Sequence, residues 1–286
     1  MPIVLVTGAA QGIGLATVCK LAKEGYRVYG MVRSHSDTKV LDQAIKNNSK
    51  YLSKVVGDVT HSSSIEKIVN SIIEERGCID IVINNACHVV VGTCETCTIR
   101  EQQQSMDVNY FGAVRVLQET LPHFRRQQSG LVINISSVAG YEPFPHLESY
   151  VAAKYALEGL TESLASHLKP WNIRVALIEP GGVKTKAPRR APLGSRRLPD
   201  TDAYEKYCTH AKQQMIESYD SSLEPSKIAD VVSMICKSDK PNLRYPVGDF
   251  AIMRAKERFK DFTGDAYVNY KNKLLSDTFL YQHLEK

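Results

Sequence analysis

The 286-residue sequence predicts an α/β fold in which helices cover both faces of a doubly wound parallel sheet of seven strands. Short apolar runs rich in β-branched residues alternate with amphipathic stretches of helical period along most of the chain. This is the order of repeated β-α-β units. The first strands are also almost continuously apolar, as strands are when helices cover both faces of a sheet.

Strands are predicted where short apolar runs are bounded by turn-forming residues, at 3–7, 27–32, 54–56, 79–84, 131–136, 174–178 and 245–247. Helices are predicted where the apolar period is near 3.6, at 12–24, 40–47, 63–76, 101–127, 149–168 and 225–236. We expect one domain over residues 1–286. Residues 184–222 follow the carboxyl end of a strand, where ligands bind in such sheets, and are expected to form a substrate lid. Residues 251–286 are expected to form a helical extension.

Composition excludes several classes of protein. Hydrophobic residues make up 43% of the chain and charged residues 23%, which is ordinary for a soluble globular protein. The net charge of +5 is mild, and the local basic runs lack interleaved aromatics, so we expect no nucleic-acid partner. No apolar stretch approaches the roughly 18–20 residues of a membrane span, so no transmembrane segment is expected. The seven cysteines are expected to be reduced thiols, and a cytoplasmic location is therefore expected.

Tyr150 and Lys154 stand four residues apart at the start of a predicted helix, which places them on one face. An isolated phenol has a pKa near 10, too high for ready proton exchange at neutral pH. A nearby cation favours the phenolate and lowers that pKa toward the working range of a general acid–base. Alone, the pair is weak evidence, because such pairs are usually solvated.

A glycine-rich segment, Thr7 to Gly14, follows the first predicted strand and opens a helix. Glycines permit the tight turn, and they let backbone N–H groups approach a pyrophosphate at a helix N-terminus. The strand–turn–helix context favours dinucleotide binding over a plain turn.

The full set of motifs resembles the short-chain dehydrogenase/reductase family from about residue 3 to residue 247, which implies a Rossmann-type fold. The set comprises Thr7 to Gly14, Gly57-Asp58-Val59, Asn84-Asn85-Ala86, Asn109, Ser136-Ser137, Tyr150 with Lys154, and Pro180-Gly181-Gly182 with Thr185. The segments 28–33 and 243–248 look most like the hydroxysteroid and retinol dehydrogenases of that family.

The resemblance implies catalytic roles for four residues. Tyr150 would be the general acid–base, and Lys154 would lower its pKa and hold the nicotinamide ribose. Ser137 would hydrogen-bond the substrate oxygen; Ser136 is the weaker candidate by spacing. Asn109 would support a water chain that relays protons to Lys154.

The resemblance also implies a set of cofactor-binding residues, to which Tyr150 and Lys154 belong, and an assembly as a homodimer or homotetramer through the long helices near 101–127 and 149–168. Asn84 would line the cofactor cleft, Asp58 and Val59 would contact adenine, and Val183 and Thr185 would meet the nicotinamide carboxamide. The complete set adds Gly8, Gln11, Gly12, Ile13, Gly14, Arg33, Ser34, Asn85, Ala86, Pro180 and Gly181.

The end of the second strand argues for the choice of cofactor. An NAD site places an acid there for the ribose 2′-hydroxyl, whereas a 2′-phosphate is met by Arg. Here Arg33 and Ser34 end the strand, and no acid occurs before Asp37. NADP(H) is therefore favoured, with NAD(H) as the alternative. Gln11 argues against this choice, because many NADP-binding relatives carry a basic residue at that position.

Cys87 stands where the family usually has a glycine, close to the cofactor, and we expect its small side chain to be tolerated. Cys87, His88, Cys94 and Cys97 have poor spacing for zinc, so no metal site is expected.

The function expected is reduction or oxidation of a carbonyl/alcohol pair on a small, apolar, steroid-, retinoid- or other lipid-like molecule. Two alternatives stay open. One is a non-catalytic, dinucleotide-binding regulatory protein. The other is a redox-neutral isomerase, epimerase or dehydratase on the same fold.

Overall fold

The computed structural model describes residues 1–196, 202–220, 222–259, 263–265, 269 and 273. In this part of the chain, seven parallel strands form one sheet in the order β3-β2-β1-β4-β5-β6-β7. The strands are β1 Ile3–Thr7, β2 Arg27–Val32, β3 Leu52–Val56, β4 Ile81–Asn84, β5 Gly130–Ile135, β6 Ile173–Pro180 and β7 Arg244–Val247. The predicted doubly wound, Rossmann-type sheet is confirmed, and the strand ends differ from the predicted ends by one or two residues.

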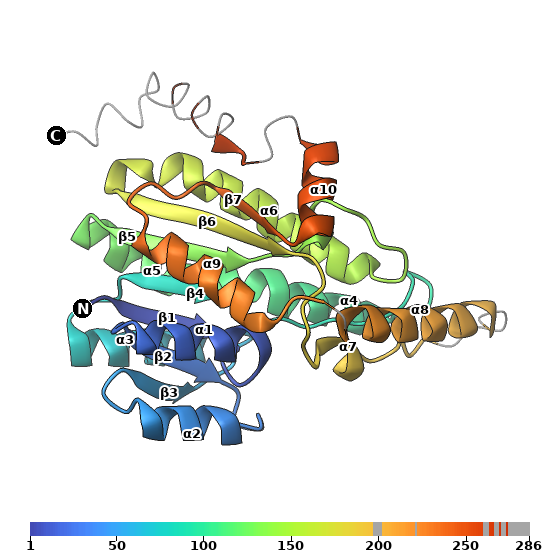
Figure 1. Ribbon diagram of the computed structural model, residues 1–286, viewed down its shortest axis with the longest axis horizontal. Coiled ribbons are helices and arrows are strands. Elements are labelled where there is room, and N and C mark those ends of the chain that lie inside the picture. The colour runs from blue at the N-terminus through green and yellow to red at the C-terminus, as the bar shows by residue number, and fades with distance from the viewer. Residues whose placement is uncertain (197–201, 221, 260–262, 266–268, 270–272, 274–286) are drawn as a thin grey trace.

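Helices cover both faces of the sheet (Figure 1). One face packs on α1 Gly12–Lys23, α2 Lys39–Asn47 and α9 Pro225–Lys237; the other packs on α3 Ser62–Arg76, α5 Gly112–Gln127 and α6 Glu148–His167. Alternate strand residues feed the two cores: Val4 and Val6 point to the first, and Ile3 and Leu5 to the second. Burial on both faces explains why β1 is apolar throughout.

The segment 101–127 is helical, as predicted, but a π-helical turn interrupts the α-helix. The segment forms α4 Ile99–Met106, a π-helical turn Asp107–Phe111 and then α5. Asn109 lies in that turn, where its side-chain amide donates to the carbonyl oxygens of Ser105 (2.8 Å) and His88 (2.7 Å). These bonds hold the chain where one residue is inserted into the helical turn, a feature that often marks functional sites.

The strand order reverses between β1 and β4, and the carboxyl ends of these two strands form the crevice where such sheets bind ligands. The glycine-rich loop follows β1, and Asn85 to His88 follow β4. Ser136 and Ser137 follow β5, so three of the predicted motifs meet at one edge of the sheet.

The predicted lid contains α7 Ala187–Arg190 and α8 Asp202–Asp220, which lie near α4 at one end of the molecule (Figure 1). Residues 197–201 and 221 of the predicted lid lie outside the described residues. A small apolar cluster packs this segment against the chain after β4: it contains Val91, Ala191 and Cys208, with Val89, Leu147, Leu193 and Met215 at its edge.

The predicted helical extension begins within α10 Asp249–Arg258, and most of its remainder lies outside the described residues. Among the helices that the structure describes, none has both the length and the apolar character to cross a bilayer.

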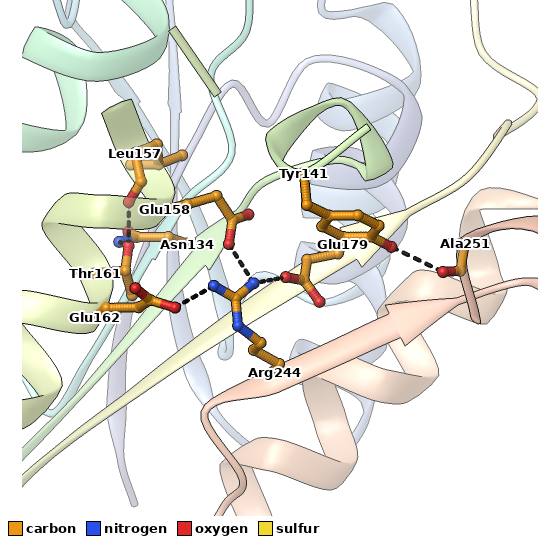
Figure 2. A network of polar contacts seen from close by, with 9 residues as sticks. All are labelled: Asn134, Tyr141, Leu157, Glu158, Thr161, Glu162, Glu179, Arg244 and Ala251. Carbon is orange, nitrogen blue, oxygen red and sulfur yellow. Dashed lines mark hydrogen bonds and ion pairs between the residues drawn. The ribbon is translucent and has the colours of Figure 1, made fainter. Parts of the chain in front are cut away.

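Two buried polar networks fasten α6 to the sheet (Figure 2). In the first, Asn84 on β4 donates to Asn134 on β5 (2.8 Å), and Asn134 donates to the Thr161 hydroxyl on α6 (2.8 Å). In the second, Arg244 on β7 pairs with glutamates on α6 and β6. Polar groups buried with their partners specify one packing of the helix, because each would be left unsatisfied in another.

Candidate active site

Tyr150 and Lys154 lie on the first two turns of α6, on the face turned toward the sheet. Lys154 is only 2% exposed, and its ammonium donates to the carbonyl oxygen of Ile135 at the end of β5 (2.8 Å). The ammonium nitrogen is 5.7 Å from the centre of the Tyr150 ring. The shared face predicted from the spacing of four residues is confirmed: Lys154 is buried and Tyr150 half-buried, so the two do not form a solvated surface pair.

Ser137 lies two residues after the end of β5 and directly precedes a short 3₁₀ turn. Its backbone is extended, and its hydroxyl accepts a hydrogen bond from the amide of Ala139 (3.1 Å), which opens a 3₁₀ turn at Val138–Gly140. The same side chain lies close enough to the Tyr150 hydroxyl to lower its pKa. Ser137 and Tyr150 therefore present two hydroxyl groups side by side, the arrangement needed to bind one substrate oxygen from two directions.

The electrostatics of the pair differ from the expectation. Burial raises the pKa of Tyr150 well above its usual value, with Cys87 and Tyr219 adding to the rise and Ser137 opposing it. Burial lowers the pKa of Lys154, although the nearby Cys87 and Glu158 oppose this. The predicted lowering of the Tyr150 pKa by Lys154 is wrong for this structure, since desolvation of the phenol dominates. Tyr150 is therefore held in the protonated form that a proton donor requires.

Asn109 and Lys154 line the same small cavity, and the side-chain amide of Asn109 is hydrogen-bonded to backbone groups. Besides its two donated bonds, its side-chain oxygen accepts from the amide of His88 (3.1 Å). A cavity of about 10 Å³ lies between the two residues and is also lined by the polar side chains of Thr7 and Asn84. That volume and those polar groups suit about one water molecule. The water chain implied for Asn109 remains a prediction. The cavity has room for about one of its water molecules.

The glycine-rich loop is locked by the chain after β4. The amide of Asn85 donates to the Thr7 hydroxyl (2.9 Å), and its side chain donates to the carbonyl oxygens of Thr7 (2.9 Å) and Gly8 (3.2 Å). Gly8 and Gly12 have φ values of 68° and 56°, a region that favours glycine. A Cβ on Gly14 would lie 2.3 Å from the Gly8 oxygen. The three glycines are thus each required by the turn itself.

The loop suits a bound pyrophosphate. Within the described part of the chain, no side chain caps the N-terminus of α1, so its first N–H groups remain available as donors. These donors and the helix dipole favour an anion at this position. Gln11 and Ile13 flank the turn, as predicted, and Gln11 accepts a hydrogen bond from Arg190 of α7. The lid segment therefore touches the loop directly.

The residues predicted at the adenine end lie together. Arg33 and Ser34 are exposed just after β2, and Asp58 and Val59 follow β3, the neighbouring strand. Burial would raise the pKa of Asp58, but hydrogen bonds from the amide (3.0 Å) and hydroxyl (2.8 Å) of Thr60 hold it below its usual range. Asp58 stays ionised beside the positive charge of Arg33, which is free of a direct carboxylate contact in the described residues.

The loop after β6 completes the crevice. The amide of Gly181, next to Pro180, donates to Val247 of β7 (3.0 Å), and Val183 is buried. Thr185 lies against Gly12, and its hydroxyl accepts from the amide of Ala187 at the start of α7 (3.3 Å). The structure therefore brings the predicted residues of this loop to the glycine-rich turn.

Three neighbours of the catalytic groups were not predicted. Cys87 lies close enough to the Tyr150 hydroxyl to raise its pKa, so this position borders the predicted acid–base directly. His88 binds Asn109 through its backbone, and Glu158 lies one turn beyond Lys154. The spacing of Glu158 from Lys154 was visible in the sequence, whereas the contacts of Cys87 and His88 depend on the fold. No group of three His, Cys, Asp or Glu side chains in the described residues is arranged to hold a metal ion.

Comparison with known proteins identifies relatives of the whole fold. Residues 2–193 match the family model described as short chain dehydrogenase. A 3-ketodihydrosphingosine reductase from Bacteroides thetaiotaomicron is 32% identical over 247 residues, which are 86% of this chain and 87% of that protein. Its name is neither a hydroxysteroid nor a retinol dehydrogenase, so the predicted subgroup is not confirmed.

Solved structures give the same result. A short-chain dehydrogenase from Streptomyces avermitilis superposes with a TM-score of 0.76 at 28% identity, covering 97% of each chain. A metagenomic short-chain oxidoreductase solved in complex with NADP superposes with a TM-score of 0.68 at 26% identity. The match covers 86% of this chain and 96% of that one.

Gly14→Ala tests the glycine-rich turn. The new Cβ would meet the Gly8 oxygen and the Asn85 amide nitrogen at 2.3 and 2.6 Å, so the loop must shift. We expect a loss of about 1–3 kcal/mol in the free energy of unfolding, with weaker dinucleotide binding. Gly159→Ala on α6 is the control: its Cβ meets open space, and stability should rise by about 0.5–1 kcal/mol. Urea denaturation and NADPH fluorescence titration measure both. Unchanged stability and affinity in Gly14→Ala would contradict the turn as described.

Proposed function

Because the chain belongs to the short-chain dehydrogenase family, we propose that it is an NADP(H)-dependent oxidoreductase that interconverts a carbonyl and an alcohol. The observation that supports this best is the placement of Tyr150, Ser137 and Lys154 together, beside a dinucleotide-type glycine turn. A regulatory protein would need neither the paired hydroxyl groups nor the buried ammonium.

The chemistry follows from the positions of these groups. A bound nicotinamide supplies or accepts the hydride. During reduction, Tyr150 donates its proton to the carbonyl oxygen while Ser137 hydrogen-bonds that oxygen, which stabilises the developing negative charge. Lys154 offsets the charge left on Tyr150 and would hold the nicotinamide ribose. Asn109 and the small cavity beside Lys154 would hold the water that returns a proton.

The cofactor preference is proposed on the end of β2. Arg33 and Ser34 are exposed there, and Arg can pair with a 2′-phosphate through two parallel hydrogen bonds. The metagenomic relative binds NADP, which is consistent with this choice. NAD(H) remains the alternative, because Gln11 offers no charge to the phosphate.

The substrate is proposed to be apolar and lipid-like. The apolar cluster of the lid segment, including Met215, lies near α4, and Tyr207 stands edge-on to His146 with ring centres 3.9 Å apart. The sequence also suggests Tyr204, with Tyr207 and Met215, as a residue that lines an apolar wall for the substrate, but its side chain lies outside the described residues. The Bacteroides relative is named for a long-chain ketone, so 3-ketodihydrosphingosine joins steroids and retinoids as a candidate.

We also propose a homodimer through α5 and α6. A groove of about 370 Å³ runs between these helices and is lined mostly by apolar side chains, with Leu117, Leu121, Leu160, Leu164 and Trp171 among them. Exposed apolar grooves of this kind mark association surfaces. A reducing, cytoplasm-like compartment is proposed because all seven cysteines are free thiols.

Tyr150→Phe tests the acid–base assignment. Removing the hydroxyl should reduce kcat at least about a hundredfold, the usual contribution of a positioned proton donor, and leave the NADPH dissociation constant within about threefold. The assay follows NADPH consumption with 3-ketodihydrosphingosine, ketosteroids, retinal, aldehydes and quinones. Tyr155→Phe, on an exposed tyrosine of the same helix, is the control and should keep full activity. Equal activity of the two variants would refute the role.

Arg33→Asp tests the cofactor preference. The carboxylate would repel a 2′-phosphate and accept a hydrogen bond from a ribose 2′-hydroxyl. We expect NADPH affinity to fall about tenfold or more, as for loss of one charge-assisted contact, and NADH affinity to rise. Lys39→Asp, on α2 beyond the loop, controls for net charge. An unchanged ratio of NADPH to NADH affinity would exclude Arg33 as the phosphate ligand.

Leu121→Arg tests the association surface. A guanidinium in the middle of the groove would be buried without a partner in a dimer, so dimers should dissociate at micromolar concentration. Multi-angle light scattering measures the mass. Val40→Arg, at an exposed apolar residue of α2, should leave the mass unchanged. A wild-type protein that is already monomeric at high concentration would exclude the proposed dimer.

A further inference from the structure

The polar ridge of α6 continues beyond the catalytic pair. Tyr150, Lys154, Glu158 and Glu162 follow one another at intervals of four residues and so share one face of the helix. Glu158 and Glu162 both reach Arg244 at the start of β7, and Glu179 on β6 reaches it from the opposite side (Figure 2). The Glu158–Arg244 contact measures 2.5 Å.

This cluster is closed to water except at one edge. Glu179 is 0% exposed, and Glu158 and Arg244 are 5% and 4% exposed. The Phe259 ring covers the guanidinium, with 4.6 Å between the guanidinium carbon and the ring centre. Glu162 is the exception, since about a third of its side chain reaches solvent. Three carboxyl groups thus surround one guanidinium, and two of them are fully inside the protein.

The two buried carboxyls are placed to share one proton. Burial raises the pKa of both Glu158 and Glu179, and one carboxylate oxygen of each accepts from the same Arg244 nitrogen, which brings the two groups together. Within the described residues, Glu179 Oε2 receives no hydrogen bond from an N–H or hydroxyl donor. A proton shared with Glu158 would satisfy that oxygen, and like carboxylates in contact do not both ionise. The pair therefore carries one negative charge.

Lys154 needs a negative charge that its contacts do not provide. Its ammonium is buried, its hydrogen bond goes to a neutral carbonyl, and no carboxylate of the described residues lies within ion-pair distance of it. Glu158 raises the pKa of Lys154, opposing burial, and lies one helical turn from it on α6, whereas Glu179 lies on β6. With one shared proton, the two cations Lys154 and Arg244 are balanced by Glu162 and the carboxyl pair.

We propose that Glu158 is a positioning residue for catalysis: clamped by Arg244 and sharing one proton with Glu179, it is the counter-charge that keeps Lys154 cationic. The inference rests on the proposed function, because it assigns Lys154 a role in holding the cofactor. Among the described residues, the other titratable groups packed around these side chains are Tyr141 at the carboxylates and Cys87 and Tyr150 at the ammonium. Uncharged polar neighbours include Ser136 at the carboxylates, and Thr7, Asn84 and Asn109 around the small cavity beside Lys154.

The shared proton gives the proposal a distinctive signature. In Glu158→Gln, the single charge moves entirely to Glu179, away from Lys154. In Glu179→Gln, the charge settles on Glu158, next to Lys154. Lys154 should therefore lose its proton more readily in the first variant and less readily in the second. A purely structural role would shift both variants in the same direction, since each removes one carboxylate contact of Arg244.

The experiment measures the dissociation constant of NADPH by fluorescence between pH 6 and pH 10. In the wild-type protein, affinity should fall on the alkaline side as Lys154 loses its proton. In Glu158→Gln this fall should occur about one pH unit lower, a shift expected for moving a unit charge away across a few ångströms. In Glu179→Gln it should occur at a higher pH than in the wild type. The alkaline fall in kcat should shift in the same direction as the fall in affinity. It is measured with any carbonyl substrate that the protein reduces.

Glu162→Gln is the matched control. It removes a contact to the same guanidinium at the solvent edge, and the alkaline limb should stay within about 0.2 pH unit of the wild type. Melting temperatures and circular dichroism establish that each variant is folded. If Glu158→Gln is unfolded, the shift of the alkaline limb to higher pH in Glu179→Gln still tests the proposal. Equal shifts in all three variants, or none, would overturn the proposal. A wild-type protein that binds neither NADPH nor NADH at any pH would instead overturn the proposed function, and this inference with it.

Discussion

The burial of one ammonium group constrains the architecture of the whole site. Lys154 is taken out of water on the inner face of α6, and a buried cation is tolerated only with partners that replace its hydration. The end of β5 supplies a carbonyl oxygen, and the cavity beside Asn109 has room for a water. The next helical turn supplies the charge of Glu158. Each partner comes from a different element, so the sheet order and the helix packing must both be correct before the cation is accommodated.

The second constraint is the fixed position of α6, since Tyr150 and Lys154 are useful only at a set distance from the glycine-rich turn. Asn134 and Arg244 hold the helix against the sheet from two sides, through β5 and β7. Asn85 fixes the turn itself through three hydrogen bonds. The proposed catalytic residues and the glycine-rich turn are therefore positioned by separate buried polar contacts, both anchored on strands of the sheet.

Sequence reasoning located the parts of the site that carry a local pattern. The strand–turn–helix context of Gly8 and the four-residue spacing of Tyr150 and Lys154 were sufficient to predict the crevice. The π-helical turn at Asn109 could not be predicted, because it depends on a contact with His88 across 21 residues. The Arg244–Glu158 pair spans 86 residues, and no local period links them. The pKa of Tyr150 was misjudged because spacing reveals a nearby cation but not the loss of water.

That misjudgement bears on the direction of the reaction. A phenol whose pKa is raised by burial keeps its proton at neutral pH, and a protonated Tyr150 can donate to a carbonyl oxygen but cannot accept from an alcohol. Oxidation would first require removing that proton from a site where the phenolate is poorly solvated. Under the proposed preference for NADP(H), Arg33 would bind the cofactor that cells keep mainly reduced. The raised pKa of Tyr150 and the proposed cofactor preference therefore both favour carbonyl reduction, and each does so from a different end of the crevice.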